Sequence, residues 1–108
     1  MDKKEIGKKK RRLKWLQRKL AVLGPVMRGS VVKLATKCGK PTCRCNRGQK
    51  HVQTFFSLNK GGRTKLIYLG QSRIQKATEL SRNYKRLEEI AEEITLICME
   101  LLKAKALD

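Results

Sequence analysis

The fold class is decided by residues 52–69, which read Val-Gln-Thr-Phe-Phe-Ser-Leu-Asn-Lys-Gly-Gly-Arg-Thr-Lys-Leu-Ile-Tyr-Leu. They hold two strand-forming runs on either side of a glycine turn. In residues 52–58, Phe56 and Leu58 fall on one face and Phe55 on the other, which is the alternation of a half-buried strand. Residues 59–63 predict the turn, since two successive glycines readily adopt the positive φ angles that tight hairpins need. Residues 64–69 then return as the second strand of an antiparallel hairpin.

Residues 30–37 lie upstream of the hairpin and read as a third short strand, Ser-Val-Val-Lys-Leu-Ala-Thr-Lys. Valine, leucine and threonine suit a pleated, half-buried surface. The middle of the chain is therefore predicted to form a small antiparallel sheet, with a cysteine-rich loop between its first two strands.

That loop concentrates three of the four cysteines and the single histidine, with the spacing C-x4-C-x-C-x5-H. Three thiolates and one imidazole make a complete tetrahedral zinc shell. We expect one structural Zn²⁺, in a zinc-finger-like loop, because four protein ligands leave no open position for substrate. The predicted ligands are Cys38, Cys43, Cys45 and His51.

Other interpretations of the cysteines remain open. A disulfide would leave one clustered thiol unpaired, and the thiols could instead be buried or reactive. His51 could be a surface residue, with Cys98 or a partner atom as fourth ligand, although Cys98 itself is expected in the core. The absence of an evident signal peptide indicates a reducing cytoplasm, where clustered cysteines favour metal over disulfides.

Residues 5–23 predict an amphipathic helix that ends at Gly24-Pro25. Its leucines recur at helical spacing on one side, and most of the basic residues fall on the other. Trp15 falls on the basic side. The leucines are Leu13, Leu16, Leu20 and Leu23, with Ile6 one heptad earlier.

A second, long helix is predicted from a capping box, in which Ser72 is the N-cap and Gln75 lies three residues on, to about Ala106. Its apolar stripe is broader than a two-stranded seam and longer than a small sheet can cover. Either the N-terminal helix or a second copy of the chain must therefore cover the rest. The stripe comprises Leu80, Tyr84, Leu87, Ile90, Ala91, Ile94, Ile97, Cys98 and Leu101.

The predicted fold class is therefore α+β in a single domain. Residues 1–25 form the basic helix, residues 26–70 the zinc loop and hairpin, and residues 71–108 the long helix.

The charge is strongly positive and uneven. The formal net charge is +18, and 22 of the 27 lysines and arginines fall in residues 1–78 beside only Asp2 and Glu5. Such an excess predicts an anionic partner. Four acids of the long helix, Glu88, Glu89, Glu92 and Glu93, could face the basic helix, but they cannot neutralise all of its cations.

The candidate nucleic-acid contacts form three clusters, which would supply phosphate contacts and, at Arg44 and Arg47, contacts to guanine edges. Trp15 could stack on a base or pack against Val22. The first cluster is Lys8, Lys9, Lys10, Arg11, Arg12, Lys14, Trp15, Arg18 and Lys19. The second is Lys33, Lys37, Lys40, Arg44, Arg47 and Lys50, and the third is Lys60, Arg63 and Lys65.

No catalytic residues are predicted, because the basic segment lacks the clustered carboxylates of metal-dependent nucleases and has no phosphate-binding glycine loop. The basic amphipathic helix is also compatible with an anionic membrane surface. We expect no membrane partner, since the cysteine loop has no role in that account. No stretch approaches the length of a spanning helix.

The chain carries two motifs before His51, namely Arg28-Gly29-Ser30 and Cys38-Gly39-Lys40-Pro41-Thr42-Cys43-Arg44-Cys45. In these motifs it resembles an uncharacterised family of small bacterial and archaeal proteins. The resemblance covers roughly residues 28–102 and implies a zinc site, a hairpin and a long C-terminal helix. This chain departs after the histidine, where the family tends to have Gly-Pro and tyrosines. The family's members look like cargo or accessory proteins of mobile elements.

Together these patterns predict a non-enzymatic, zinc-stabilised nucleic-acid-binding protein, cytoplasmic and nucleoid-associated, with DNA as partner. RNA binding in a ribonucleoprotein is an alternative. Another is an adaptor that forms a homodimer, or recruits a larger protein partner, through residues 74–102.

Overall fold

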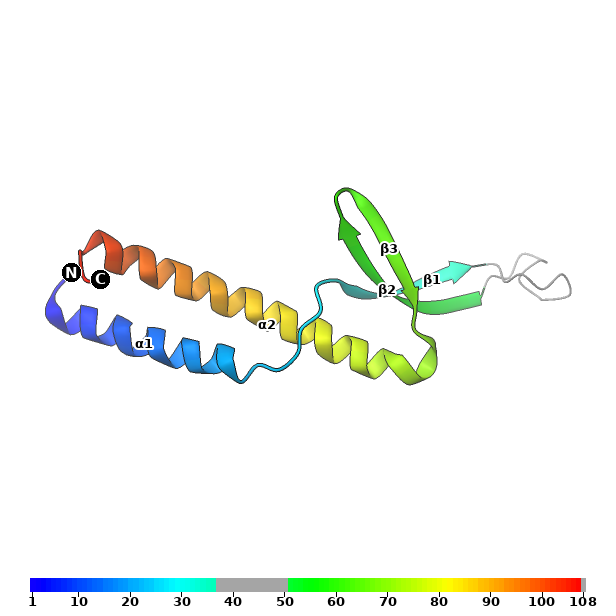
Figure 1. Cartoon of the computed structure of the whole chain (residues 1–108), viewed down its shortest axis with the longest axis horizontal. Coiled ribbons are helices and arrows are strands. Elements are labelled where there is room, and N and C mark those ends of the chain that lie inside the picture. Colours follow the sequence, from blue (N-terminus) through cyan, green and yellow to red (C-terminus); the bar gives the residue numbers. More distant parts are fainter. Residues whose placement is uncertain (37–50, 108) are drawn as a thin grey trace, which may run out of the picture. The chain divides into compact units, whose positions relative to one another are not determined.

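A computed structural model describes residues 1–36 and 51–107 as two helices and a three-stranded antiparallel sheet (Figure 1). The predicted α+β class is confirmed for these residues, and the predicted zinc loop lies outside them. The elements are α1 (Lys3–Ala21), β1 (Ser30–Thr36), β2 (His51–Lys60), β3 (Arg63–Tyr68) and α2 (Gly70–Lys103).

The chain forms two compact units. The helical unit comprises Met1–Pro25 and Asn83–Asp108, and the sheet unit comprises Val26–Arg82. Helix α2 contributes its first part to the sheet unit and the remainder to the helical unit. Among the described residues, neither helix has an apolar stretch long enough to cross a bilayer.

In the helical unit, α1 begins with Asp2 as N-cap, whose carboxylate accepts a hydrogen bond of 2.8 Å from the backbone N–H of Glu5. This contact satisfies one of the free N–H groups of the first turn. The helix ends at Ala21, two residues before the predicted end at Leu23.

Helix α1 packs along the later part of α2 and builds one core from four buried side chains. The N-terminal helix therefore covers this part of the predicted apolar stripe. Cys98 is partly buried against this core, as expected. Leu20 was predicted on the buried side of α1 but is 37% exposed. The core residues are Leu13, Leu16, Ile97 and Leu101, and Ile6, Ile90 and Ile94 pack against them.

In the sheet unit the strand order is β1-β2-β3, with all neighbours antiparallel. The three predicted strands are confirmed to within two residues at the described ends. The turn is shorter than predicted, because β2 continues to Lys60 and only Gly61 and Gly62 connect it to β3. Their φ angles of +61° and +78° match the right-handed strand twist, which favours this two-residue connection.

The sheet packs one face against the start of α2 through Phe56, Leu69 and Ala77. Gly29 allows this packing, since a Cβ there would lie 2.5 Å from the Phe56 ring. The buried Ser81 hydroxyl donates to the Gly29 carbonyl at 2.8 Å and ties β1 to α2.

The predicted capping box at Ser72 is wrong, because α2 already begins at Gly70. Gly70 has a φ of +63°, which only glycine adopts readily, so the chain turns directly from β3 into the helix.

Candidate nucleic-acid interface

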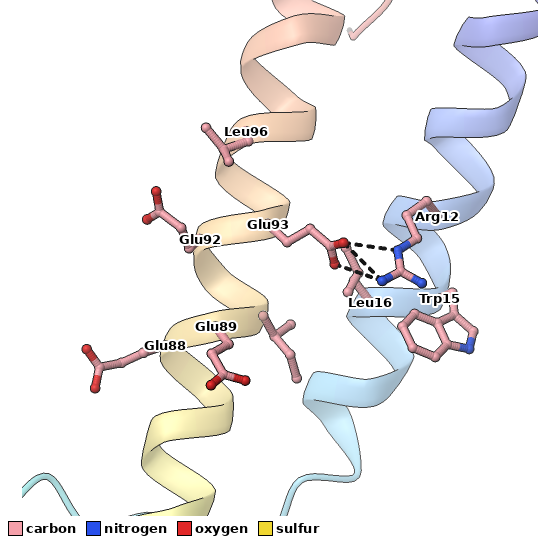
Figure 2. Close-up of a pocket in the computed structure, with 9 residues that line it drawn as sticks. Arg12, Trp15, Leu16, Glu88, Glu89, Glu92, Glu93 and Leu96 are labelled. Carbon is pink, nitrogen blue, oxygen red and sulfur yellow. Dashed lines mark hydrogen bonds and ion pairs between the residues drawn. The ribbon is translucent and has the colours of Figure 1, made fainter.

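Two cations of α1 are engaged by acids of α2 within the helical unit. The Arg12 guanidinium forms a forked ion pair with Glu93, with Nη2 lying 2.9 Å from Oε1 and 3.1 Å from Oε2 (Figure 2). The Lys9 ammonium forms an ion pair with one carboxylate oxygen of Glu100. These two predicted nucleic-acid contacts are therefore occupied by contacts between the helices.

The opposite side of α1 carries the free cations. At 100° per residue, Arg11 and Arg18 lie on the side away from Leu13 and Leu16, and Lys8 lies at the edge of that side, next to the groove that Arg12 and Ile97 line. All three are exposed, and none is ion-paired in the part of the chain that the structure describes. Lys10 and Lys14 are also exposed and equally without an acid among these residues. The predicted first cluster thus divides into inward cations that hold the helices together and outward cations that face solvent.

Trp15 lies between these two groups and is 40% exposed. The Arg12 guanidinium carbon lies 4.3 Å from the ring centroid, and the Lys19 ammonium lies 5.2 Å from it. Two cations at this distance are attracted to the negative face of the indole. Val22, with which Trp15 was predicted to pack as an alternative, is 77% exposed.

An open groove of about 740 Å³ lies beside Trp15 in the helical unit (Figure 2). Of the four acids predicted to face the basic helix, only Glu93 pairs with it. Glu88, Glu89 and Glu92 have no ion pair among the described residues. Three unpaired carboxylates repel phosphate, so this side of the unit is unsuited to a polyanion. The groove is lined by Arg12, Trp15, Leu16, Glu88, Glu89, Ile90, Glu92, Glu93 and Leu96.

In the sheet unit, three predicted contacts gather at the hairpin turn. The β2–β3 register places Lys60 directly opposite Arg63, and Lys65 opposite Leu58 on the same face. Lys33 of β1 lies opposite Thr54, also on this face. Like charges directly across a strand pair are destabilising. An anion bound at Lys60 and Arg63 would relieve that repulsion.

The other face of the sheet carries an aromatic pair that sequence reasoning missed. Phe55 and Tyr68 are cross-strand partners, with ring centroids 5.8 Å apart and planes at 66°. Counting outward from the two-glycine turn would have paired them. The described lysines and arginines of the strands all lie on the opposite face.

The remaining predicted residues lie outside the described part of the chain, namely Lys37, Cys38, Lys40, Cys43, Arg44, Cys45, Arg47 and Lys50. The ends of this segment are described. Thr36 closes β1 and His51 opens β2, and the two are cross-strand partners. Both ends of the cysteine segment are thus anchored at one end of the sheet. Among the described residues, no group of three or more His, Cys, Asp or Glu side chains is arranged to hold a metal.

These features define a small α+β protein in which a basic helix and a three-stranded sheet carry unpaired cations. The chain belongs to the family described as a domain of unknown function, DUF6788, which it matches over residues 6–79. This match is consistent with the uncharacterised family that the sequence motifs resemble. It also includes most of α1, whereas the resemblance in the motifs covered only residues 28–102. No curated protein and no solved structure matches the chain.

Proposed function

We propose that this chain is a non-enzymatic nucleic-acid-binding protein whose phosphate contacts come from the outward cations of α1 and from the hairpin turn. The division of the α1 cations carries the proposal. Lys9 and Arg12 are matched by acids, whereas Lys8, Arg11 and Arg18 have none among the described residues. A surface of unmatched cations costs self-repulsion, and a phosphate polymer offsets it while releasing counterions.

A structural zinc ion completes the proposal. Cys38, Cys43, Cys45 and His51 form a donor set that suits tetrahedral Zn²⁺, and the strand pair at Thr36 and His51 holds the ends of the segment together. The ion would fix the loop that carries the second basic cluster, and its binding would be coupled to folding.

Duplex DNA is the proposed partner, because the lysines and arginines of one helix face and those of one hairpin turn each suit contacts to a phosphate backbone. The members of the family that the sequence resembles look like mobile-element cargo or accessory proteins, which supports an accessory role in a nucleoprotein complex, in the cytoplasm or nucleoid. The main alternative is RNA binding within a ribonucleoprotein.

The test measures binding of the full chain to a short DNA duplex and to an RNA hairpin by fluorescence anisotropy over a range of salt concentrations. We expect log Kd to rise linearly with log salt concentration, with about 0.9 units of slope for each phosphate contacted on B-DNA. The double variant Arg11→Gln/Arg18→Gln should lower the slope by about 2.

The matched control is Lys9→Gln/Arg12→Gln, which removes the same charge from the same helix but from the acid-paired side. It should leave the slope nearly unchanged. Equal effects of the two variants would show that net charge alone drives binding and would disprove the proposed interface. Tighter, steeper binding to the RNA hairpin would favour the ribonucleoprotein alternative.

Zinc is tested separately by native mass spectrometry. We expect one Zn²⁺ per chain, lost in Cys43→Ser. A metal-free wild-type chain that keeps its sheet and its affinity would refute the metal but not the phosphate interface.

A further inference from the structure

A short row of two exposed apolar side chains runs along α2 on the side away from its buried core, and its first member, Leu96, also borders the groove beside Trp15. Leu96 and Met99 are 53% and 60% exposed, respectively. Leu101, two residues after Met99, is fully buried against α1. At 100° per residue these two side chains lie about 160° apart around the helix. Helix α2 therefore has a second apolar surface, separate from the core.

Opposite charges flank this row at a regular spacing. Glu92 precedes Leu96 by four residues, and Lys103 follows Met99 by four, which gives the positions 92, 96, 99 and 103. Alternating steps of four and three residues keep side chains on one helix face, as in the seam of a coiled coil. Glu92 and Lys103 are exposed and have no ion pair in the described ranges 1–36 and 51–107.

We propose that this face binds a second copy of the chain, with the two α2 helices antiparallel and a two-fold axis between Leu96 and Met99. Reversing the helix about that point places Leu96 against Met99 of the partner subunit. The same operation places Glu92 against the partner's Lys103, and the symmetry repeats both contacts. One residue set thus supplies both sides of an isologous interface.

The charge order selects this arrangement. A parallel pair would place Glu92 against the partner's Glu92 and Lys103 against the partner's Lys103, and like charges at a seam are repulsive. An unrelated partner would need no such match between the two ends of one row. The row is therefore complementary to the same row of a second copy in antiparallel orientation.

The expected dimer is reversible. Two apolar side chains with their flanking charges fall below the roughly 800 Å² per partner of a standard stable interface. Each copy also carries a net charge of +18, which opposes association until salt screens it. The paired residues all belong to α2, so the interface uses none of the outward cations of α1. This inference does not depend on the proposed nucleic-acid function.

The test is the monomer–dimer equilibrium of the full chain, measured by sedimentation equilibrium at about 150 mM salt. The wild type should dimerise with a Kd in the micromolar range, and Met99→Glu should remove the dimer. Glu92→Lys and Lys103→Glu should each weaken it about tenfold, since each converts two attractive contacts into repulsive ones. The double variant Glu92→Lys/Lys103→Glu should restore the wild-type Kd.

Two features separate this geometry from a general charge effect. Lys103→Glu lowers the net charge, so reduced repulsion alone would strengthen the dimer rather than weaken it. Glu79→Lys, on the first part of α2, has the same charge change as Glu92→Lys and should weaken the dimer much less. Circular dichroism confirms that the variants, all at exposed positions, remain folded. A wild-type monomer at every concentration, unaffected single reversals, or a double variant as weak as the singles would each overturn the proposal.

Discussion

The helical unit and the sheet unit treat their positive charge differently. In the helical unit, Glu93 and Glu100 of α2 neutralise two cations of α1, and the remaining α1 cations have no ion pair with the residues that the structure describes. Residues 26–82 contain a single acid, Glu79, which pairs with Lys76 on its own helix. The cations at the hairpin turn therefore have no acid to meet within their unit. Cations that stabilise the fold can thus be distinguished from cations that remain available for a ligand.

The two units also differ in how their cores are built. The helical unit packs four aliphatic side chains from two helices, an arrangement that depends mainly on volume. The sheet unit depends on one close approach, in which the Phe56 ring lies where a side chain at Gly29 would project. The stability of the helical unit should therefore fall most when a buried side chain is made smaller. The stability of the sheet unit should fall most when a side chain is added at Gly29.

The largest expected effect comes from lost volume in the helical unit. Leu101→Ala should lower the free energy of unfolding by about 4 kcal/mol, because Leu101 is fully buried and its truncation leaves a cavity. Leu102→Ala, one residue on and 59% exposed, is the control and should change it by less than about 0.5 kcal/mol. Urea unfolding followed by fluorescence of Trp15, the only tryptophan, reports on this unit. Similar losses in both variants would contradict the described packing of α1.

A somewhat smaller effect is expected from added volume in the sheet unit. Gly29→Ala should destabilise the sheet by about 3 kcal/mol, since the new Cβ would overlap Phe56 and the φ of +141° disfavours a side chain. Gly61→Ala is the matched control: its φ is also positive, but nothing lies within 4 Å of the new Cβ. It should cost only about 1 kcal/mol. Hydrogen exchange of the β2 amides measures the loss of sheet stability in both variants. Equal losses would mean that backbone strain, not packing against Phe56, constrains Gly29.

Local patterns were enough to predict the elements of this fold. The alternation in residues 52–58 and the glycines at 61–62 fixed the hairpin, and the leucine spacing predicted both helices. The length of the apolar stripe on the long helix also predicted that the N-terminal helix or a second copy of the chain covers it. The start of α2 was mispredicted because Ser72 and Gln75 form a good capping box, while the positive φ of Gly70 allows the helix to begin earlier.

The candidate site was less predictable, because charge alone does not say which cations have partners. Arg11 and Arg12 are adjacent and carry the same charge, yet among the described residues only Arg12 contacts an acid. That acid, Glu93, lies 81 residues away in the sequence. A pairing of this kind depends on how two helices rotate against each other, which their own sequences constrain only loosely. The Phe55–Tyr68 pair was missed for a different reason, since it needs the exact strand register.

The smallest expected effect concerns the ion pairs of the two units. A double-mutant cycle on Arg12→Gln and Glu93→Gln should give a coupling of about 0.5–1 kcal/mol, because the pair is forked and joins two helices. The same cycle on Lys76→Gln and Glu79→Gln should give only about 0.3 kcal/mol, as expected for an exposed pair within one helix. The cycle removes the separate contribution of the Arg12–Trp15 contact, because that contact is absent from both variants that lack Arg12. If the two couplings were equal, Arg12 would be as free to bind phosphate as Arg11, and the division between inward and outward cations would lose its energetic basis.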